Sequence, residues 1–264
     1  MINDEKLREY NFHGFIPGPQ EKVSVFLKRA DLAKYQRSSH QAIAIVQYLF
    51  DVCPSWVKIE PTNRLHLWEA AATYIEESQG IFTPIVQMKK KGVPFWCSQE
   101  EILAHELIHA TRIAFKESLF EEVLAYKTSR NWLRRYFGPI FFHPREAVLF
   151  LFFLVGIWCY QLGYLFFFED LPSLTLWIPC ILAGLLIIRV VIVQTIFSLC
   201  LKKIYKLLKQ PDKALGFALR LSDREIIDFA FKSLDKMQKY IGKAKEKSLR
   251  WYMLALIYPI KNRY

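Results

Sequence analysis

The chain lacks the cysteine patterns that are typical of disulfide-rich or cysteine-ligated metal proteins. It contains five cysteines, no two of them form a C-x-x-C pair, and three lie in long apolar runs. This pattern argues against a disulfide framework and against a cysteine-based metal site. A glycine-rich phosphate loop, an internal repeat and a nucleic-acid-binding motif are also missing. We therefore expect no nucleic-acid partner.

Acidic charge is scarce as well. The net charge is +11, and 53% of the residues are hydrophobic, with 21 phenylalanines. A basic balance suits nucleic acid or an anionic membrane surface, and the apolar content favours the membrane. The segment 1–6 is charged and has no apolar core, so we do not expect it to be a signal peptide.

Charged residues are almost absent from two long runs. Residues 147–168 contain none and would measure about 33 Å as a helix, enough to cross a bilayer. Residues 174–201 contain one, Arg189, which we expect to face a partner or to reach a headgroup region. We predict a transmembrane hairpin over 141–201. A buried pair of soluble helices is the alternative, although two such runs in succession are rare outside membranes.

One metal-binding pattern stands out. His105, Glu106 and His109 form H-E-x-x-H, and a capping box of Ser98 and Glu101 predicts that they lie on a helix over 99–115. Residues four apart share a helix face, so the two imidazoles can bind one metal ion. Glu106 can then act as the general base for a water bound to that ion.

A third ligand is needed, because catalytic zinc usually takes three from the protein. Glu122 would lie about 20 Å from His109 on an unbroken helix, so the chain must turn back near 116–118. A second capping box, from Ser118 to Glu121, predicts this break and a new helix that continues to about Tyr136. Glu121 is the alternative ligand. We expect Tyr126, one turn after Glu122, to donate a hydrogen bond to the oxyanion.

Residues 97–126 resemble the gluzincin zinc metallopeptidases. In those families H-E-x-x-H supplies two ligands and the base, and a Glu in an E-x-x-A pattern supplies the third, which Glu122 and Ala125 match. The resemblance implies Zn²⁺ held by His105, His109 and Glu122, and a protein or peptide substrate. It also implies an α+β fold with a zincin-like domain over 1–140.

Three segments preceding the motif have strand character. They are 56–60, 65–77, where helix remains open, and 81–88. Pro84 indicates an edge position for the third strand. In zincins an edge strand beside the active-site helix binds the substrate backbone, and 81–88 is the candidate; an ordinary edge strand is the alternative.

The charged flanks predict the orientation of the hairpin. The turn contains Glu169 and Asp170, whereas both outer flanks are basic. The flanking cations are Arg130, Arg134, Arg135 and Arg145 before the hairpin, and Lys202, Lys203, Lys206 and Lys209 after it. The positive-inside rule then places both termini and the zinc site in the cytoplasm.

Residues 202–264 complete the organisation as a helical C-terminal region. A capping box at Ser222 and Glu225 predicts a helix to about Ile241, and a short helix follows from Arg250. The whole sequence thus predicts an integral membrane zinc metallopeptidase whose substrates lie near the bilayer. The alternatives are a catalytically inactive zincin-fold scaffold and an interaction protein in which the motif is accidental.

Overall fold

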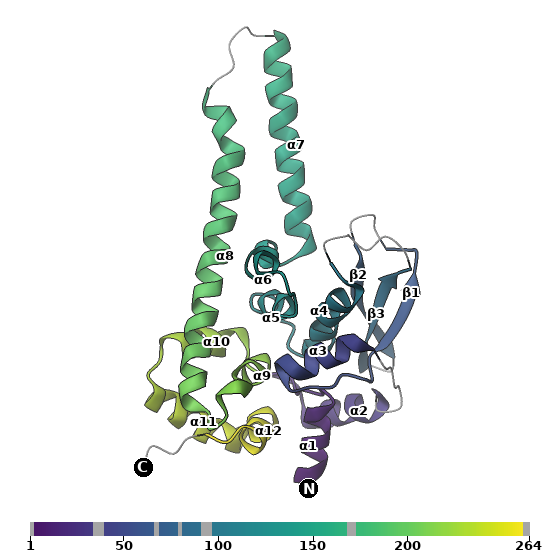
Figure 1. Cartoon of the computed structure of the whole chain (residues 1–264), viewed down its shortest axis with the longest axis vertical. Coiled ribbons are helices and arrows are strands. Elements are labelled where there is room, and N and C mark those ends of the chain that lie inside the picture. The colour runs from purple at the N-terminus through teal and green to yellow at the C-terminus, as the bar shows by residue number, and fades with distance from the viewer. Residues whose placement is uncertain are drawn as a thin grey trace.

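The computed structural model describes residues 3–33, 40–65, 69–78, 81–90, 97–167 and 173–260, and the fold is mixed α+β and mostly helical. Figure 1 shows a body of short helices and one sheet, from which two long helices project. Before the projection the elements are α1 (Asp4–Phe12), α2 (Val23–Ala33), α3 (Gln41–Phe50), β1 (Lys58–Thr62), β2 (Ala71–Ser78), β3 (Ile81–Lys89), α4 (Gln99–Arg112), α5 (Glu121–Tyr126), α6 (Trp132–Phe137) and the 3₁₀ turn η1 (Gly138–Ile140). The projection and the C-terminal part of the body comprise α7 (Pro144–Phe167), α8 (Ser173–Leu207), η2 (Pro211–Lys213), α9 (Ala214–Leu219), α10 (Asp223–Phe231), α11 (Leu234–Lys247) and α12 (Leu249–Ile257).

The sheet has the order β1-β3-β2, with β3 parallel to β1 and antiparallel to β2. The strand predictions are confirmed, including β2 in the segment where helix remains open. The hairpin turn that Ser78, Gln79 and Gly80 predict lies partly outside the described residues. The prediction that 81–88 is an edge strand is wrong, because β3 lies in the middle. Pro84 is tolerated because pairing with β1 begins only at Ile85, so Pro84 itself is paired on one side, with Ile75 of β2.

Helix α4 forms where the sequence predicts it. The Ser98 hydroxyl accepts a hydrogen bond from the Glu101 N–H at 3.1 Å and caps the helix. The leucines, isoleucines and alanines of the helix are buried, so α4 passes through the interior of the body. It packs against β2 and β3 on one side and against α3 and α5 on the other.

The second predicted capping box is wrong. Helix α5 begins at Glu121 with no side-chain cap from its own N-cap residue, and the Ser118 hydroxyl lies 3.0 Å from His143 Nε2 instead. The carboxylate of Asp223, on α10, accepts hydrogen bonds from the N–H groups of Leu119 and Phe120 at 2.9 and 3.3 Å. A distant side chain therefore stabilises this helix start. The predicted continuation to Tyr136 is also wrong, since α5 ends at Tyr126 and α6 starts anew with Asn131 as its cap.

A single hydrophobic cluster connects the N-terminal elements with the C-terminal helices. It includes α8, whose lower half carries a buried stripe with alternating spacings of three and four residues. The stripe consists of Val190, Val193, Phe197, Cys200, Ile204 and Leu207. This spacing gives a helix one continuous apolar face, which here packs largely against α10.

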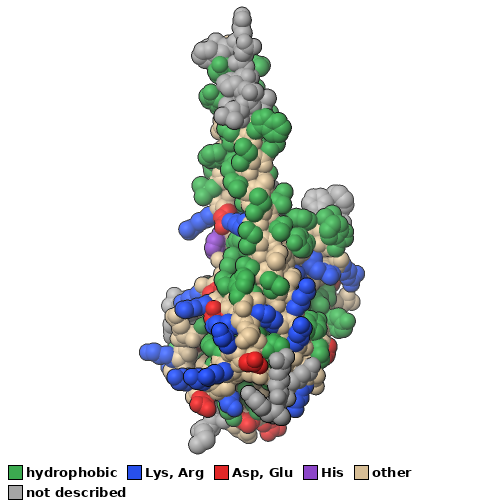
Figure 2. Space-filling model, turned by 90° about the vertical axis from the view of Figure 1, so that its left-hand side faces the viewer, with side chains coloured by type: hydrophobic (Ala, Val, Ile, Leu, Met, Phe, Trp, Pro, Cys, Tyr) green, Lys and Arg blue, Asp and Glu red, His purple; other side chains and the backbone are tan. Residues whose placement is uncertain are grey.

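Helices α7 and α8 are long and apolar enough to span a membrane, over Arg145–Phe166 and Trp177–Leu207. None of the residues in the apolar segment of α7 is buried inside the protein. Figure 2 shows hydrophobic side chains covering the projecting part, with charged side chains gathered from its base downwards. Exposed apolar surface on this scale is unusual for a helix in contact with water.

Arg189 lies directly before the buried stripe of α8 and level with the start of α7, because it contacts Glu146 in the first turn of that helix. It donates hydrogen bonds to Glu146 Oε2 at 2.7 Å and to the Ile140 carbonyl at 2.6 Å. Its guanidinium group also lies 4.4 Å from the centre of the Phe142 ring. The partner that the sequence requires for Arg189 is thus Glu146 of the same chain.

The C-terminal capping box is confirmed, with the Ser222 and Glu225 side chains and backbone N–H groups paired reciprocally. The helix is shorter than predicted, because it ends at Phe231 and α11 begins at Leu234. The mostly charged residues 243–247 predict a solvated stretch, and they form the last turns of α11 with their lysines exposed.

Candidate metal centre

Helix α4 brings the two histidines together. His105 Nε2 and His109 Nε2 are 3.2 Å apart, and the rings meet edge to face with centroids 4.9 Å apart. Both side chains are largely buried. The i,i+4 spacing thus places two imidazole nitrogens where one ion can contact both.

Glu122 completes the cluster from α5. Its Oε1 lies 3.4 Å from His109 Nε2, and its Oε2 lies 3.6 Å from His105 Nε2. One ligand atom from each of the three residues lies within 4.8 Å of the others. The chain reverses between the two helices, with Lys116 in the left-handed region at φ 54°. The three residues predicted as ligands therefore converge.

Glu121 has a different position from its neighbour. Its Oε1 lies 2.7 Å from His109 Nδ1, on the opposite side of the ring from Glu122. A carboxylate in this place fixes the proton on Nδ1 and leaves Nε2 free to bind a metal. Glu121 is thus a partner of a ligand, whereas the sequence kept it open as a ligand itself.

Glu106 is held by the edge strand β2. The Thr73 hydroxyl donates to Glu106 Oε2 at 2.8 Å and lies 3.2 Å from the Glu106 backbone oxygen. Thr73 could not be predicted from the sequence, because no local pattern connects a strand residue with a helix residue so far along the chain. The contact fixes one carboxylate oxygen and leaves the other available for proton transfer.

Tyr126 packs behind His105, with ring centroids 4.6 Å apart and nearly perpendicular planes. A side chain at Gly138 would collide with the Tyr126 ring, so glycine is required there for this packing. Burial raises the pKa of the Tyr126 phenol to about 12 and keeps it protonated. Tyr126 is not among the described residues that line the cleft, so its clearest contact is with the His105 ring.

The cluster places two imidazoles against three carboxylates, and this shifts several pKa values. Burial and the neighbouring His109 and Arg134 charges lower the pKa of His105 well below its usual value. Burial also lowers the pKa of His109, but Glu121, Glu122 and Glu106 outweigh it and raise that pKa to about 9. Burial raises the pKa of Glu122 to about 7. A cation placed between these groups would relieve the mutual repulsion of the carboxylates.

An open cleft of about 660 Å³ exposes the cluster. Its walls include Thr73 and Ile75 of β2 on one side and Phe142 and His143, just before α7, on the other. The sequence predicts that His143 is interfacial rather than a metal ligand, because Pro144 prevents it from pairing along a helix. His143 lies in this wall, 3.0 Å from the Ser118 hydroxyl and outside the three-residue cluster. The cleft thus runs from a sheet edge to the base of the projecting helices.

The donor set matches a known chemistry. Two imidazoles and one carboxylate are a ligand set of catalytic zinc sites. No family model, curated protein or solved structure matches this chain. A metal centre is therefore inferred from the geometry of the His105, His109 and Glu122 side chains.

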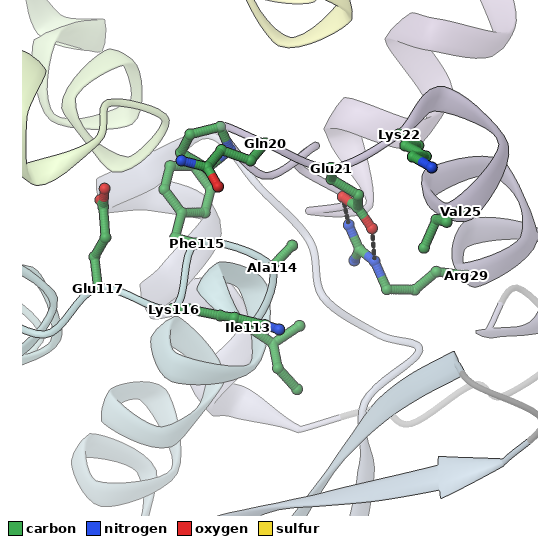
Figure 3. A pocket seen from close by; sticks show the side chains of 11 residues that line it. Gln20, Glu21, Lys22, Val25, Arg29, Ile113, Ala114, Phe115, Lys116 and Glu117 are labelled. Atoms are coloured by element: carbon green, nitrogen blue, oxygen red, sulfur yellow. Dashed lines mark hydrogen bonds and ion pairs between the residues drawn. The ribbon is translucent and has the colours of Figure 1, made fainter.

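A second cavity of about 580 Å³ adjoins the cleft and shares Ile113, Lys116 and Glu117 with it. Figure 3 shows that its far wall is built on an ion pair between Arg29 and Glu21. Both guanidinium–carboxylate contacts are close to 3 Å, and the pair is almost fully buried. The two cavities together extend the accessible space beyond the C-terminal end of α4.

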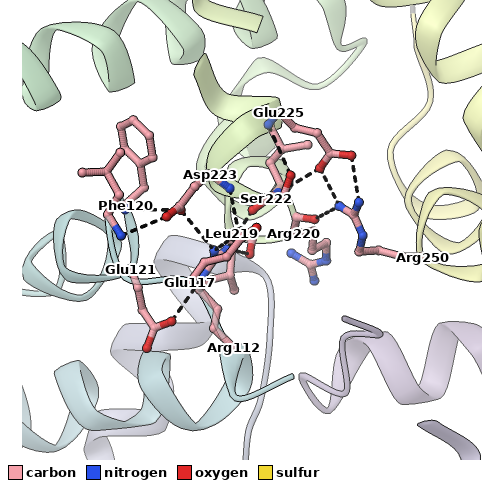
Figure 4. A network of polar contacts seen from close by, with 12 residues as sticks. Arg112, Glu117, Phe120, Glu121, Leu219, Arg220, Ser222, Asp223, Glu225 and Arg250 are labelled. Atoms are coloured by element: carbon pink, nitrogen blue, oxygen red, sulfur yellow. Dashed lines mark hydrogen bonds and ion pairs between the residues drawn. The ribbon is translucent and has the colours of Figure 1, made fainter. Parts of the chain in front are cut away.

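Arg112 connects the centre with the C-terminal helices. It is fully buried and donates from Nη1 to the carbonyls of Leu219 at 2.6 Å and Leu221 at 2.9 Å. Its guanidinium group lies between 3.7 and 3.9 Å from carboxylate oxygens of Glu117, Glu121 and Asp223 (Figure 4). Glu121, which contacts His109, thus belongs to a network of charged side chains that reaches Asp223 on α10.

Proposed function

We propose that this protein is a zinc metallopeptidase with a zincin-like catalytic region, anchored in a membrane by α7 and α8. The observation that carries the proposal is the convergence of His105, His109 and Glu122 on one point of an open cleft. Glu106 lies beside them with one oxygen fixed by Thr73. This combination provides a place for a metal, a base and room for a substrate.

The residues fit zinc, and each has a definable role. His105, His109 and Glu122 would hold the ion, which when bound lowers the pKa of a water molecule towards ~7 and polarises a carbonyl group. Glu121 keeps the Nδ1 proton of His109 in place. Arg112 in turn holds Glu121 through a contact of 3.9 Å.

Glu106 would move the proton in peptide hydrolysis. Its carboxylate takes a proton from the attacking water as the oxygen adds to the carbonyl carbon. The same proton then passes to the amide nitrogen as the carbon–nitrogen bond breaks, which gives a carboxylic acid and an amine. The remaining proton of the water then moves from the acid to the amine, so the products leave as a carboxylate and an ammonium group. Tyr126 packs behind His105, so we assign it the role of orienting the His105 ring. This replaces the hydrogen bond to the oxyanion that its spacing from Glu122 predicts.

The substrate would lie along β2. This strand has no partner on its outer side among the described residues, and it forms a wall of the cleft. An extended peptide can add to such an edge through backbone hydrogen bonds. The role of binding the substrate backbone, predicted for residues 81–88, is therefore assigned to β2. The residues that precede α7 line the same cleft.

Metal content and cleavage test the proposal together. The full-length protein, purified in detergent, should contain about one zinc per chain, as three-ligand sites do. His105→Ala and His109→Ala should lose it, whereas His40→Ala, at an exposed helix start, should keep it. Glu106→Gln should keep zinc and lose peptide cleavage, because this residue acts on water.

The outcomes distinguish the remaining alternatives. Stoichiometric zinc in the double His105→Ala, His109→Ala variant would mean that the motif is accidental and the protein has another role. Zinc lost in these variants, together with no cleavage by the wild-type protein of any peptide in a broad library, would point to an inactive scaffold.

A further inference from the structure

A basic groove lies between α3, the 127–130 turn and α6. Its volume is about 520 Å³, and three of its lining residues are the cations Lys127, Arg130 and Arg135. The other described lining residues are apolar, aromatic or hydroxyl-bearing, and none is acidic. They are Ala44, Ile45, Tyr48, Leu49, Thr128, Ser129 and Leu215. The groove therefore combines positive charge with apolar walls.

The contacts that the structure describes for the Lys127 and Arg135 side chains are with uncharged groups, and Arg135 donates to the Ser129 carbonyl at 3.0 and 2.8 Å. The ammonium group of Lys127 donates to Gln194 Oε1 at 3.1 Å and lies 5.4 Å from the centre of the Phe197 ring. Burial and the charge of Arg135 lower its pKa to about 8. Glu101 approaches this segment through the Arg130 N–H and pairs with Arg134, which does not line the groove.

Helix α6 carries exposed apolar side chains above the groove. Trp132 is 68% exposed and Leu133 is 49% exposed, and no residue of the helix is buried. Gln194 of α8 donates to the Arg135 and Tyr136 carbonyls at 3.3 and 2.9 Å and holds α6 against the projecting pair. Figure 1 places α6 level with the base of α7. Tryptophan at that level is typical of a membrane interface.

We propose that this groove and α6 form a binding site for an anionic phospholipid at the base of the hairpin. The phosphate would lie against Lys127, Arg130 and Arg135, since guanidinium and ammonium groups bind phosphate oxygens through charge-assisted hydrogen bonds. The acyl chains would lie beside Trp132, Leu133 and Phe137. The position of α6 beside two membrane-length helices favours a lipid over a soluble phosphate. The site is independent of the metal centre.

Titration of phosphatidylglycerol tests the charged part. Full-length protein in neutral detergent micelles should bind a fluorescent phosphatidylglycerol in preference to phosphatidylcholine. The triple variant Lys127→Gln, Arg130→Gln, Arg135→Gln should bind it roughly 100-fold more weakly, since each basic residue near an anionic surface contributes about five-fold. The control variant Lys236→Gln, Lys239→Gln, Lys243→Gln removes the same charge from the exposed face of α11 and should bind within about two-fold of wild type.

Two further experiments distinguish a loss of binding from a loss of folding, and a lipid from a soluble phosphate. Arg130→Gln alone changes a side chain without a packing role and should lose about five-fold while its thermal unfolding stays that of the wild type. Soluble glycerol phosphate should not displace the lipid at equal concentration. Displacement would identify a soluble phosphate as the ligand and overturn the lipid proposal, as would equal lipid affinity of the triple variant and wild type.

Brominated lipids test the apolar part. Trp132 fluorescence, obtained as the difference between wild type and Trp132→Phe, should be quenched by bromine on the upper acyl chain in vesicles containing phosphatidylglycerol. An unquenched difference signal would show that α6 does not contact the bilayer and would overturn this part of the site.

Discussion

At the residue scale, the adjacent carboxylates Glu121 and Glu122 contact different nitrogen atoms of the histidine pair. The histidine pair and Glu106 were predictable because i,i+4 spacing is a local property of a helix. Two neighbouring glutamates on one short helix point in different directions, and only the fold shows that Glu122 approaches both Nε2 atoms while Glu121 approaches Nδ1 of His109. Thr73 and Arg112 carry no local signal, because their contacts depend on tertiary structure.

These positions predict different effects of two similar substitutions. Glu121→Gln keeps the size of the side chain but loses the charge that holds the His109 proton, so zinc affinity should fall about 10–100-fold. Glu122→Gln removes a ligand charge and should cost more. Competition with a chromophoric chelator measures both, with Glu100→Gln in the first turn of α4 as the control. A larger loss from Glu121→Gln than from Glu122→Gln would reverse the two assignments.

At the scale of elements, local signals succeeded where no distant group competed with them. The cap of α4 and the reciprocal box at Ser222 formed as their patterns predict. The box at Ser118 did not form, because α5 begins only at Glu121 and the Ser118 hydroxyl lies against His143 Nε2. Asp223 accepts hydrogen bonds from the two N–H groups that precede the helix. In the same way Pro84 indicated an edge, but β1 pairs only with the part of β3 beyond it.

The C-terminal helices depend on one buried carboxylate with a predictable pH response. Glu225 accepts hydrogen bonds from both terminal nitrogens of Arg250 and from Trp251 Nε1, each at 2.8 Å. Burial by itself would raise its pKa, but these partners outweigh burial and leave the pKa below the usual value. A lowered folded-state pKa contributes stability above the unfolded value of about 4.3, and this stability is lost as the pH falls through the folded pKa.

We therefore expect Glu225→Gln to lower the free energy of unfolding by about 3–5 kcal/mol at pH 7, because it leaves the Arg250 charge buried without its partner. The difference from wild type should narrow as the pH falls below about 4. Chemical denaturation of the detergent-solubilised protein at several pH values measures this, with the exposed Glu246→Gln as control. A difference that stays constant down to pH 3 would contradict the assignment.

At the scale of the whole molecule, the second apolar run consists of two parts in different surroundings, and composition alone did not distinguish them. Residues from Val190 onwards pack against α10 and other parts of the body, whereas the part before Arg189 projects with α7. The buried stripe was not visible in the sequence, because exposed positions between its members, such as Val191, Ile192 and Leu199, are apolar as well. The ion pair of Arg189 with Glu146 then lies where the body meets the projecting helices.

The same architecture brings the cleft close to the proposed membrane surface, because Phe142 and His143 form its wall immediately before α7. If α7 and α8 span the bilayer as a hairpin, a reporter inserted at Ser173 should lie on the opposite side from one fused at the C-terminus. The basic flanks predict that the C-terminus and the candidate metal site lie on the cytoplasmic side. Two reporters on the same side would contradict the hairpin.

Substrates anchored in the same membrane should then be cleaved faster than soluble ones. A short flexible tether gives an effective concentration on the order of millimolar, so a peptide attached to a single membrane-spanning helix should be cleaved much faster than the free peptide at micromolar concentration. Both forms should be cut at the same bond, and Glu106→Gln should abolish both reactions. Equal rates for the two forms would leave the metal centre and the hairpin in place, but would show that the position of the cleft beside α7 does not select membrane-bound substrates.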